Sequence, residues 1–148
     1  MSSLILALLL LEGPSPTPWP RPEQMEPMGK SPAQCASERE ALPRPKGASI
    51  KGRATKAQLE ALSKGWRETR SRYYLSALYE HHIVYLRPGE PAAPLLALLG
   101  DRTKFPWADP SDTDYRYNSH EPPFCQPIQL MVLVDKVSRV IQSYKLGS

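Results

Sequence analysis

Cysteine is scarce in this sequence. Only two of its 148 residues are cysteines, Cys35 and Cys125, and each lies in a proline-containing stretch. A secreted domain of this length that depends on disulfides usually carries four, six or eight cysteines. Two isolated cysteines are typical of reduced thiols in a cytosolic or nuclear protein, and a single long-range disulfide is the alternative.

The chain also lacks a clear targeting segment. The apolar run at residues 4–11 has eight residues, whereas a membrane-spanning helix needs about 20. No Lys or Arg precedes the run, and prolines follow it instead of a small-residue cleavage site, so it is a poor match to a signal peptide. We therefore do not expect a membrane partner, and we keep secretion only as a less favoured alternative.

Catalytic and metal-binding motifs are missing as well. His81 and His82 are adjacent, so they point in different directions on a helix and cannot chelate one ion together. A calcium loop starting at Asp112 would place Pro123 where a bidentate glutamate is needed. We expect no enzymatic activity, no catalytic residues, no metal, no cofactor and no small-molecule substrate.

Proline is absent from residues 46–87 and 128–148, although the chain has 17 prolines in all. Because proline breaks a helix interior, only these two segments can hold long helices. The alternating prolines of residues 14–22 favour an extended polyproline II conformation. We expect residues 1–54 to form a disordered proline-rich tail that starts with the short apolar run. Residues 55–146 should form a small helical region, with a connecting segment at 87–127 rich in proline and aromatic residues.

The segment 55–86 predicts a long central helix. Thr55 and Gln58 match the capping-box pattern at its start. Apolar residues recur at helical spacing in both halves of the segment. Gly65 costs a helix about 1 kcal/mol relative to alanine, so we expect any bend or break to lie near it.

Residues 128–145 predict a second helix. Apolar residues recur there at alternating spacings of four and three from Leu130 to Tyr144, as in a heptad repeat. The first half of this segment is rich in β-branched residues and could begin as a strand. Two long helices and one short one are marginal for an independent core. The predicted fold is mainly α, with a small or partner-dependent core and a disordered N-terminal region.

Positive charge is concentrated at the start of the central segment. Residues 44–72 carry nine Lys or Arg against two Asp or Glu, whereas the net charge on either side is slightly negative. A local patch of this kind steers binding toward an acidic surface. We predict that a partner contacts the arginine-rich part of the helix and the aromatic anchors of the chain: Lys64, Arg67, Arg70, Arg72, Tyr73, Tyr74, Trp107, Tyr115 and Tyr117.

These features favour a small non-enzymatic scaffold that binds an acidic protein surface or filament. In composition the chain resembles the microtubule-lining proteins of axonemes, which are short, basic, aromatic and interrupted by proline. That resemblance implies a cytoplasmic protein of the cytoskeleton or cilium. The first alternative is a nuclear accessory protein that binds nucleic acid or chromatin through residues 44–72, where arginines beside tyrosines could hold phosphates and stack bases. The second alternative is a secreted product of a weak N-terminal signal peptide.

Overall fold

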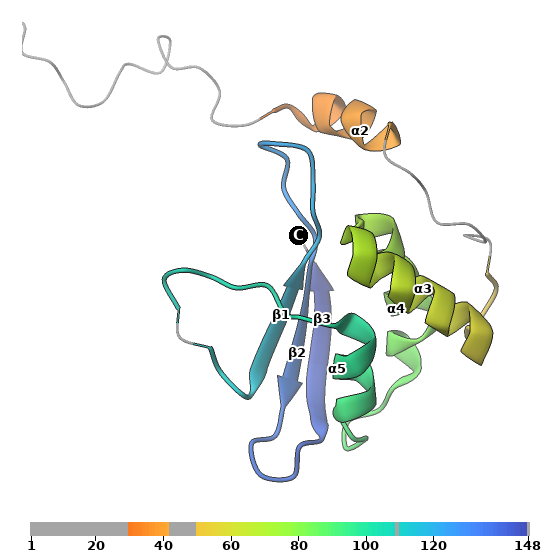
Figure 1. The fold of residues 1–148 in the computed structure, drawn as a ribbon, viewed down its shortest axis with the longest axis vertical. Helices are drawn as coiled ribbons and strands as arrows, with labels where there is room; N and C mark the ends of the chain where they lie inside the picture. Colours follow the sequence, from red (N-terminus) through yellow and green to blue (C-terminus); the bar gives the residue numbers. More distant parts are fainter. Residues whose placement is uncertain (1–29, 42–49, 109, 148) are drawn as a thin grey trace, which may run out of the picture.

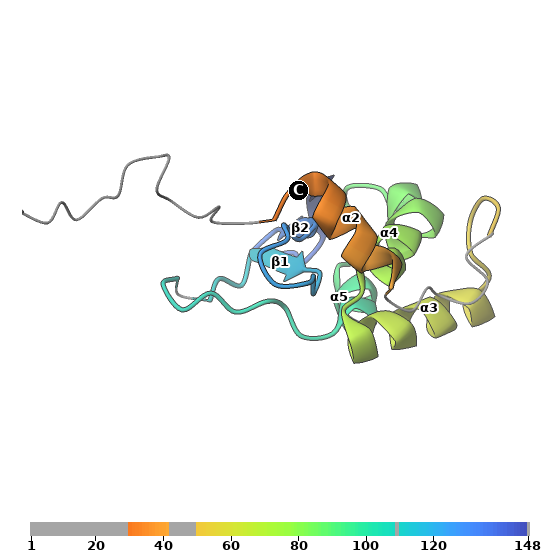
Figure 2. The same ribbon diagram turned by 90° about the horizontal axis from the view of Figure 1, so that it is seen from above.

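Three helices pack against one side of a three-stranded antiparallel sheet (Figures 1 and 2). The structure is a computed structural model, and it describes residues 30–41, 50–108 and 110–147. The apolar run at 4–11 and the alternating prolines lie outside the described residues. The described elements, in chain order, are α2 (Pro32–Glu40), α3 (Lys56–Thr69), α4 (Arg72–His81), the 3₁₀-helix η2 (Ile83–Tyr85), α5 (Ala93–Leu99), β1 (Asp114–Asn118), β2 (Gln129–Val134) and β3 (Ile141–Gly147).

The prediction of a mainly α fold is wrong, because residues 128–145 form strands instead of a helix. Leu130, Val132 and Val134 are buried, while the residues between them are half-exposed. This alternation has a period of two and belongs to a strand. The heptad match was coincidental: Val137, one of its members, is 90% exposed in the turn between β2 and β3.

A polar turn ends β2 and closes the hairpin. The Asp135 carboxylate accepts hydrogen bonds from the backbone N–H groups of Val137 and Ser138, at 3.1 and 2.8 Å. Arg139 then adopts a positive φ of 59°. An aspartate at the start of a turn stabilises the turn by accepting hydrogen bonds from backbone N–H groups two and three residues later. The turn at Asp135 therefore brings β3 back alongside β2.

The sheet has the order β1-β2-β3, and its register assigns each side chain to a face. Tyr117 pairs with Leu130, and Val132 lies between Tyr115 and Tyr144. These residues point toward the helices. The residues between them in each strand point to the opposite side, because side chains alternate along a strand.

The central segment is also not one helix. The predicted capping box is confirmed, because Thr55 and Gln58 exchange hydrogen bonds of 2.9 and 3.2 Å at the start of α3. The chain then breaks at Arg70, which has a left-handed φ of 55°, and Ser71 caps the start of α4. The break therefore lies five residues beyond the position expected from Gly65.

Gly65 serves helix packing instead. A Cβ atom at this position would lie 2.2 Å from the ring of Tyr74. A glycine here lets α3 and α4 approach closely, which a larger residue could not permit without displacing the tyrosine.

The hydrophobic core is built from residues of this chain, and they come from α3, α4, η2, α5 and all three strands. Trp66 is fully buried at its centre, and its indole N–H donates a 2.9 Å hydrogen bond to the carbonyl of Leu99. This polar contact satisfies the one polar atom of a large apolar side chain. The buried cluster comprises Leu62, Trp66, Leu75, Ala77, Leu78, Ile83, Ala92, Leu95, Leu99, Tyr117, Leu130, Val132, Val134 and Ile141.

Helix α2 lies apart from these two layers, beside the loop that joins β1 to β2 (Figures 1 and 2). Cys35 is its only buried residue, and Cys35 forms a disulfide with Cys125 of that loop. The expectation of two reduced thiols is therefore wrong. The cysteines are 90 residues apart in sequence, so only the tertiary fold reveals that they pair. The helix itself falls inside the region that was expected to be disordered.

Candidate interaction surface

The helices leave the second face of the sheet open. From the strand register, this open face carries three rows of residues that run across the strands. No helix in the described part of the chain packs on it (Figures 1 and 2). The rows are Asp114, Leu133 and Ser143; Arg116, Met131 and Lys145; and Asn118, Gln129 and Gly147.

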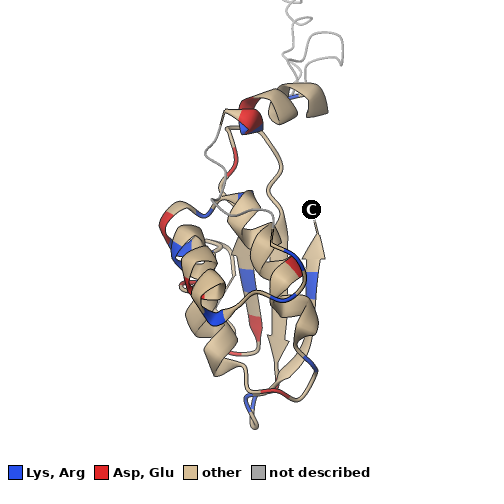
Figure 3. Cartoon of the chain, turned by 90° about the vertical axis from the view of Figure 1, so that its right-hand side faces the viewer, with Lys and Arg blue, Asp and Glu red and all other residues tan. Residues whose placement is uncertain are grey.

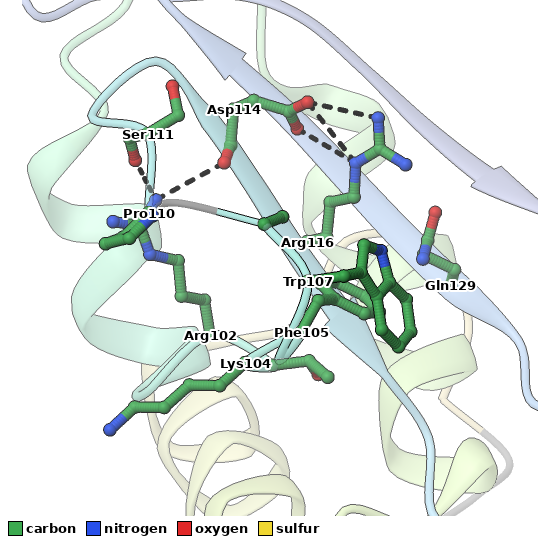
Figure 4. A pocket seen from close by; sticks show the side chains of 11 residues that line it. Arg102, Lys104, Phe105, Trp107, Pro110, Ser111, Asp114, Arg116 and Gln129 are labelled. Atoms are coloured by element: carbon green, nitrogen blue, oxygen red, sulfur yellow. Dashed lines mark hydrogen bonds and ion pairs between the residues drawn. The ribbon is translucent and has the colours of Figure 1, made fainter.

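Beside this face lies a groove of about 760 Å³ between β1 and the loop that precedes it (Figure 4). Phe105 and Trp107 form its aromatic part, with ring centroids 5.4 Å apart. Trp107 is 81% exposed, and in Figure 4 the two rings lie next to Arg116 and Gln129 of the open face. An exposed tryptophan in a groove offers a partner a large apolar contact.

The loop that carries these rings is attached to the sheet by polar contacts. The Arg102 guanidinium donates to the carbonyls of Ser111 and Asp114, and it lies 4.4 Å from the ring centroid of Tyr115. The backbone N–H of Thr103 donates to the carbonyl of Arg116 at 2.8 Å. These contacts fix the backbone next to the aromatic pair before a partner binds, which lowers the entropy cost of binding.

A second groove of about 360 Å³ continues from the first, since Arg116 and Gln129 line both. It crosses the sheet to Met131 and Lys145. We call the two together the sheet groove. Among its described lining residues the cations are Arg102, Lys104, Arg116 and Lys145, and the one carboxylate is that of Asp114.

The local electrostatics keep Arg116 charged. Its guanidinium lies 3.1 Å from the Asp114 carboxylate, and the hydrogen bonds to that carboxylate raise the pKa of Arg116. Lys145 is exposed at the other end of the row. The sheet groove therefore combines an apolar end with a cationic floor, an arrangement that suits a ligand with both apolar and acidic groups.

The three arginines predicted to contact a partner each make a contact within the protein, although Arg67 stays exposed. Arg72 forms an ion pair of 2.8 Å with Glu121. Arg70 lies 5.0 Å from the ring centroid of Trp66, and Arg67 donates to the hydroxyl of Ser63 at 3.2 Å. Lys64 is exposed on α3. On this side of the molecule blue and red positions are interspersed (Figure 3), so residues 50–72, the described part of the basic segment, do not form a patch of one sign.

The predicted aromatic anchors also separate into different environments. Tyr74 packs on Gly65, and the Tyr73 hydroxyl lies 3.4 Å from the carbonyl of Arg39. Tyr117 is fully buried, and this burial, followed by the charge of nearby Tyr115, raises its pKa to about 12. Tyr115 stacks beneath Arg102.

Of the predicted residues, Trp107 alone lines the sheet groove. The prediction missed basic neighbours of Trp107 there, among them Lys104, Arg116 and Lys145. Lys104 carried a usable signal, because it lies three residues before Trp107 in a short basic and aromatic stretch. Arg116 and Lys145 gave no such signal, since only the register of the strands places them in one row.

A buried acidic group joins α2, α4 and the β1–β2 loop. The Glu121 carboxylate is 2% exposed and contacts Arg39 at 2.7 Å and Arg72 at 2.8 Å. Burial alone would raise the pKa of Glu121, but the hydrogen bonds from Arg72, Ser119 and Arg39 together outweigh burial and lower it. Because one buried carboxylate holds two guanidinium groups from different helices, this cluster has a structural role.

The described residues contain no group of three or more histidine, cysteine or acidic side chains placed to hold a metal ion. Within the same residues, no helix is both long and apolar enough to cross a membrane. No protein-family model, curated protein or solved structure matches this chain.

Proposed function

We propose that this chain is a non-enzymatic interaction protein that binds an acidic protein surface through its sheet groove. The observation that supports this proposal is the exposed Trp107, packed on the half-buried Phe105, beside a cationic row on a sheet face that no described helix covers. Aromatic residues dominate the affinity of many interfaces, while basic residues steer association with an acidic partner. This proposal keeps the acidic partner and the Trp107 contact expected from the sequence, and it moves the basic part of the contact from residues 64–72 to the sheet.

The disulfide bears on where the partner is met. Disulfides persist in oxidising compartments and are rare in the cytosol, so the Cys35–Cys125 bond favours a secretory or extracellular setting over a cytoplasmic filament or the nucleus. We therefore propose an acidic protein of an oxidising compartment as the partner. The ion pair of Arg72 with Glu121 and the packing of Arg70 on Trp66 further weaken the nucleic-acid alternative based on residues 44–72.

A matched pair of charge reversals tests the proposal. The first variant combines Lys104→Glu and Lys145→Glu in the sheet groove, and the control combines Lys56→Glu and Lys64→Glu on the exposed side of α3. Both change the net charge equally. With immobilised poly-L-glutamate as the probe, we expect the groove variant to bind at least tenfold more weakly and the control less than twofold more weakly.

Two results would overturn the proposal. Equal losses in the groove variant and the control would mean that net charge alone, and no particular face, attracts the polymer. Tighter binding of the parent chain to a single-stranded oligothymidylate than to poly-L-glutamate at the same salt concentration would favour the nucleic-acid alternative.

A further inference from the structure

We infer that the sheet groove binds an extended peptide that runs across the strands, with a large apolar side chain at one end and two carboxylates about three residues apart. This inference rests on the proposed function and specifies the chemistry of its partner. It follows from the apolar end of the groove, from the spacing of its cations and from the amide groups in the row beside them.

The apolar end of the peptide would contact the aromatic pair. Phe105 is half-buried and supports Trp107, whose ring is largely exposed. Figure 4 shows the two rings over the side of the groove next to Arg116. A leucine or aromatic side chain placed against them would remove apolar surface from water on both partners, which favours binding.

The spacing of the cations comes from the strand register. Arg116 of β1 pairs with Met131 of β2, and Met131 pairs with Lys145 of β3. Arg116 and Lys145 are thus two strand spacings apart, or about 10 Å between their backbones. A peptide in the extended polyproline II conformation advances about 3.1 Å per residue and repeats every three residues, so carboxylates three residues apart would lie on one side of it and reach both cations.

The neighbouring row supplies groups for the peptide backbone. The side-chain NH₂ group of Gln129 donates a 2.8 Å hydrogen bond to the side-chain oxygen Oδ1 of Asn118, which orients both side chains. The side-chain oxygen of Gln129 and the side-chain NH₂ group of Asn118 can then pair with peptide N–H and C=O groups. Gly147 ends this row, and a Cβ there would meet nothing within 4 Å, so the row leaves room for a chain to lie along it.

The charge count favours a peptide over a nucleic acid. Along the cross-strand row there are two cations, and Asp114 already offsets part of the charge of Arg116. A nucleic-acid strand places a phosphate at every nucleotide and is usually held by a denser set of basic residues. Two widely spaced cations with uncharged groups between them suit a ligand that carries isolated carboxylates.

Fluorescence anisotropy with a labelled synthetic peptide tests this inference on the oxidised full chain. The probe is Leu-Ser-Glu-Ser-Thr-Glu-Gly. Three control peptides replace both Glu by Gln, replace Leu by Ser, or place the two Glu side by side. We expect the probe to bind at least fivefold more tightly than each control. Trp107→Ala and Lys145→Ala should each weaken its binding at least fivefold, and Lys64→Ala on α3 should not.

The outcomes separate this inference from the proposed function. If poly-L-glutamate binding depends on Lys104 and Lys145 but the probe binds no better than its controls, the extended-peptide mode is wrong and the acidic-partner function stands. If the probe binds and Lys64→Ala weakens it as much as Lys145→Ala, the site is misplaced. If neither poly-L-glutamate nor the probe binds the parent chain, both proposals fail.

Discussion

The two faces of the sheet are built from the same strands and differ completely in what covers them. On β2, Leu130, Val132 and Val134 are at most 1% exposed beneath the helices, while Gln129, Met131 and Leu133 remain half-exposed on the open face. An antiparallel sheet commonly packs one face against the core and exposes the other face to solvent. The comparison indicates that stability resides on the covered face and that the open face is available for binding.

Truncating neighbouring residues of β2 should give the largest effect and tests the comparison directly. We expect Leu130→Ala to lower the free energy of unfolding by about 2–5 kcal/mol, because it removes a fully buried side chain and leaves a cavity. Met131→Ala on the open face should cost about 1 kcal/mol or less. Urea unfolding followed by circular dichroism measures both, and similar losses would mean that the open face also carries the fold.

Removing the disulfide should have the next largest effect, and it should leave the covered face intact. We expect Cys35→Ser combined with Cys125→Ser to lower the free energy of unfolding by about 2–4 kcal/mol, as loss of a long-loop cross-link typically does. Hydrogen exchange should show α2 deprotected and the core amides of β2 still protected, because Cys35 is the only buried residue of α2.

Dithiothreitol provides the control for this prediction. The reductant should reproduce the loss in the parent chain and leave the double variant unchanged. Continued protection of α2 after reduction would show instead that the ion pair between Arg39 and Glu121 holds the helix without a covalent link.

The smallest effect concerns Glu121, which ties α4 of the helical layer to the β1–β2 loop. Glu121→Gln should lower the free energy of unfolding by about 1.5–3 kcal/mol at pH 7, the range for hydrogen bonds to charged groups. Because the pKa of Glu121 is lowered in the folded state, its contribution is complete above the unfolded pKa of about 4.5 and is lost as the pH falls through the folded pKa.

The difference between the parent and Glu121→Gln should therefore shrink between pH 7 and pH 3, measured as urea midpoints. Burial, with a smaller effect from Arg53, lowers the pKa of His82 and adds a separate acid-dependent loss below about pH 6.5. That loss is common to both proteins and cancels in the comparison. A difference independent of pH would show that the two arginine contacts of Glu121 do not depend on its charge.

Local signals in the sequence predicted local structure well. The capping box at Thr55 and Gln58 is present at the start of α3. The break in the central segment was predicted at the wrong residue. The low helix propensity of Gly65 can be seen in the sequence, whereas its close contact with Tyr74 can be seen only in the structure. Ser71, a favourable N-cap residue, was the available signal for the true start of α4.

The candidate site was less predictable, because it also depends on contacts between residues that are far apart in the sequence. Arg72 was expected to be available to a partner, because the sequence shows the positive charge of an arginine but not the carboxylate that pairs with it in the fold. Glu121 lies far along the chain from Arg72, and the fold brings them into contact. Trp107 could be identified as an anchor from its own neighbours, whereas Lys145 could not.

By itself the sequence determined which segments lack proline and where the first helix of the central segment starts, at the Thr55–Gln58 capping box. The tertiary structure alone decided that residues 128–145 pair as strands, that Cys35 meets Cys125, and that Arg116, Met131 and Lys145 form one row. The physical reason is range. Caps and turns depend on residues a few positions apart, whereas strand pairing, the disulfide and the cationic row depend on contacts between distant segments. The open face of the sheet is the clearest product of those long-range contacts.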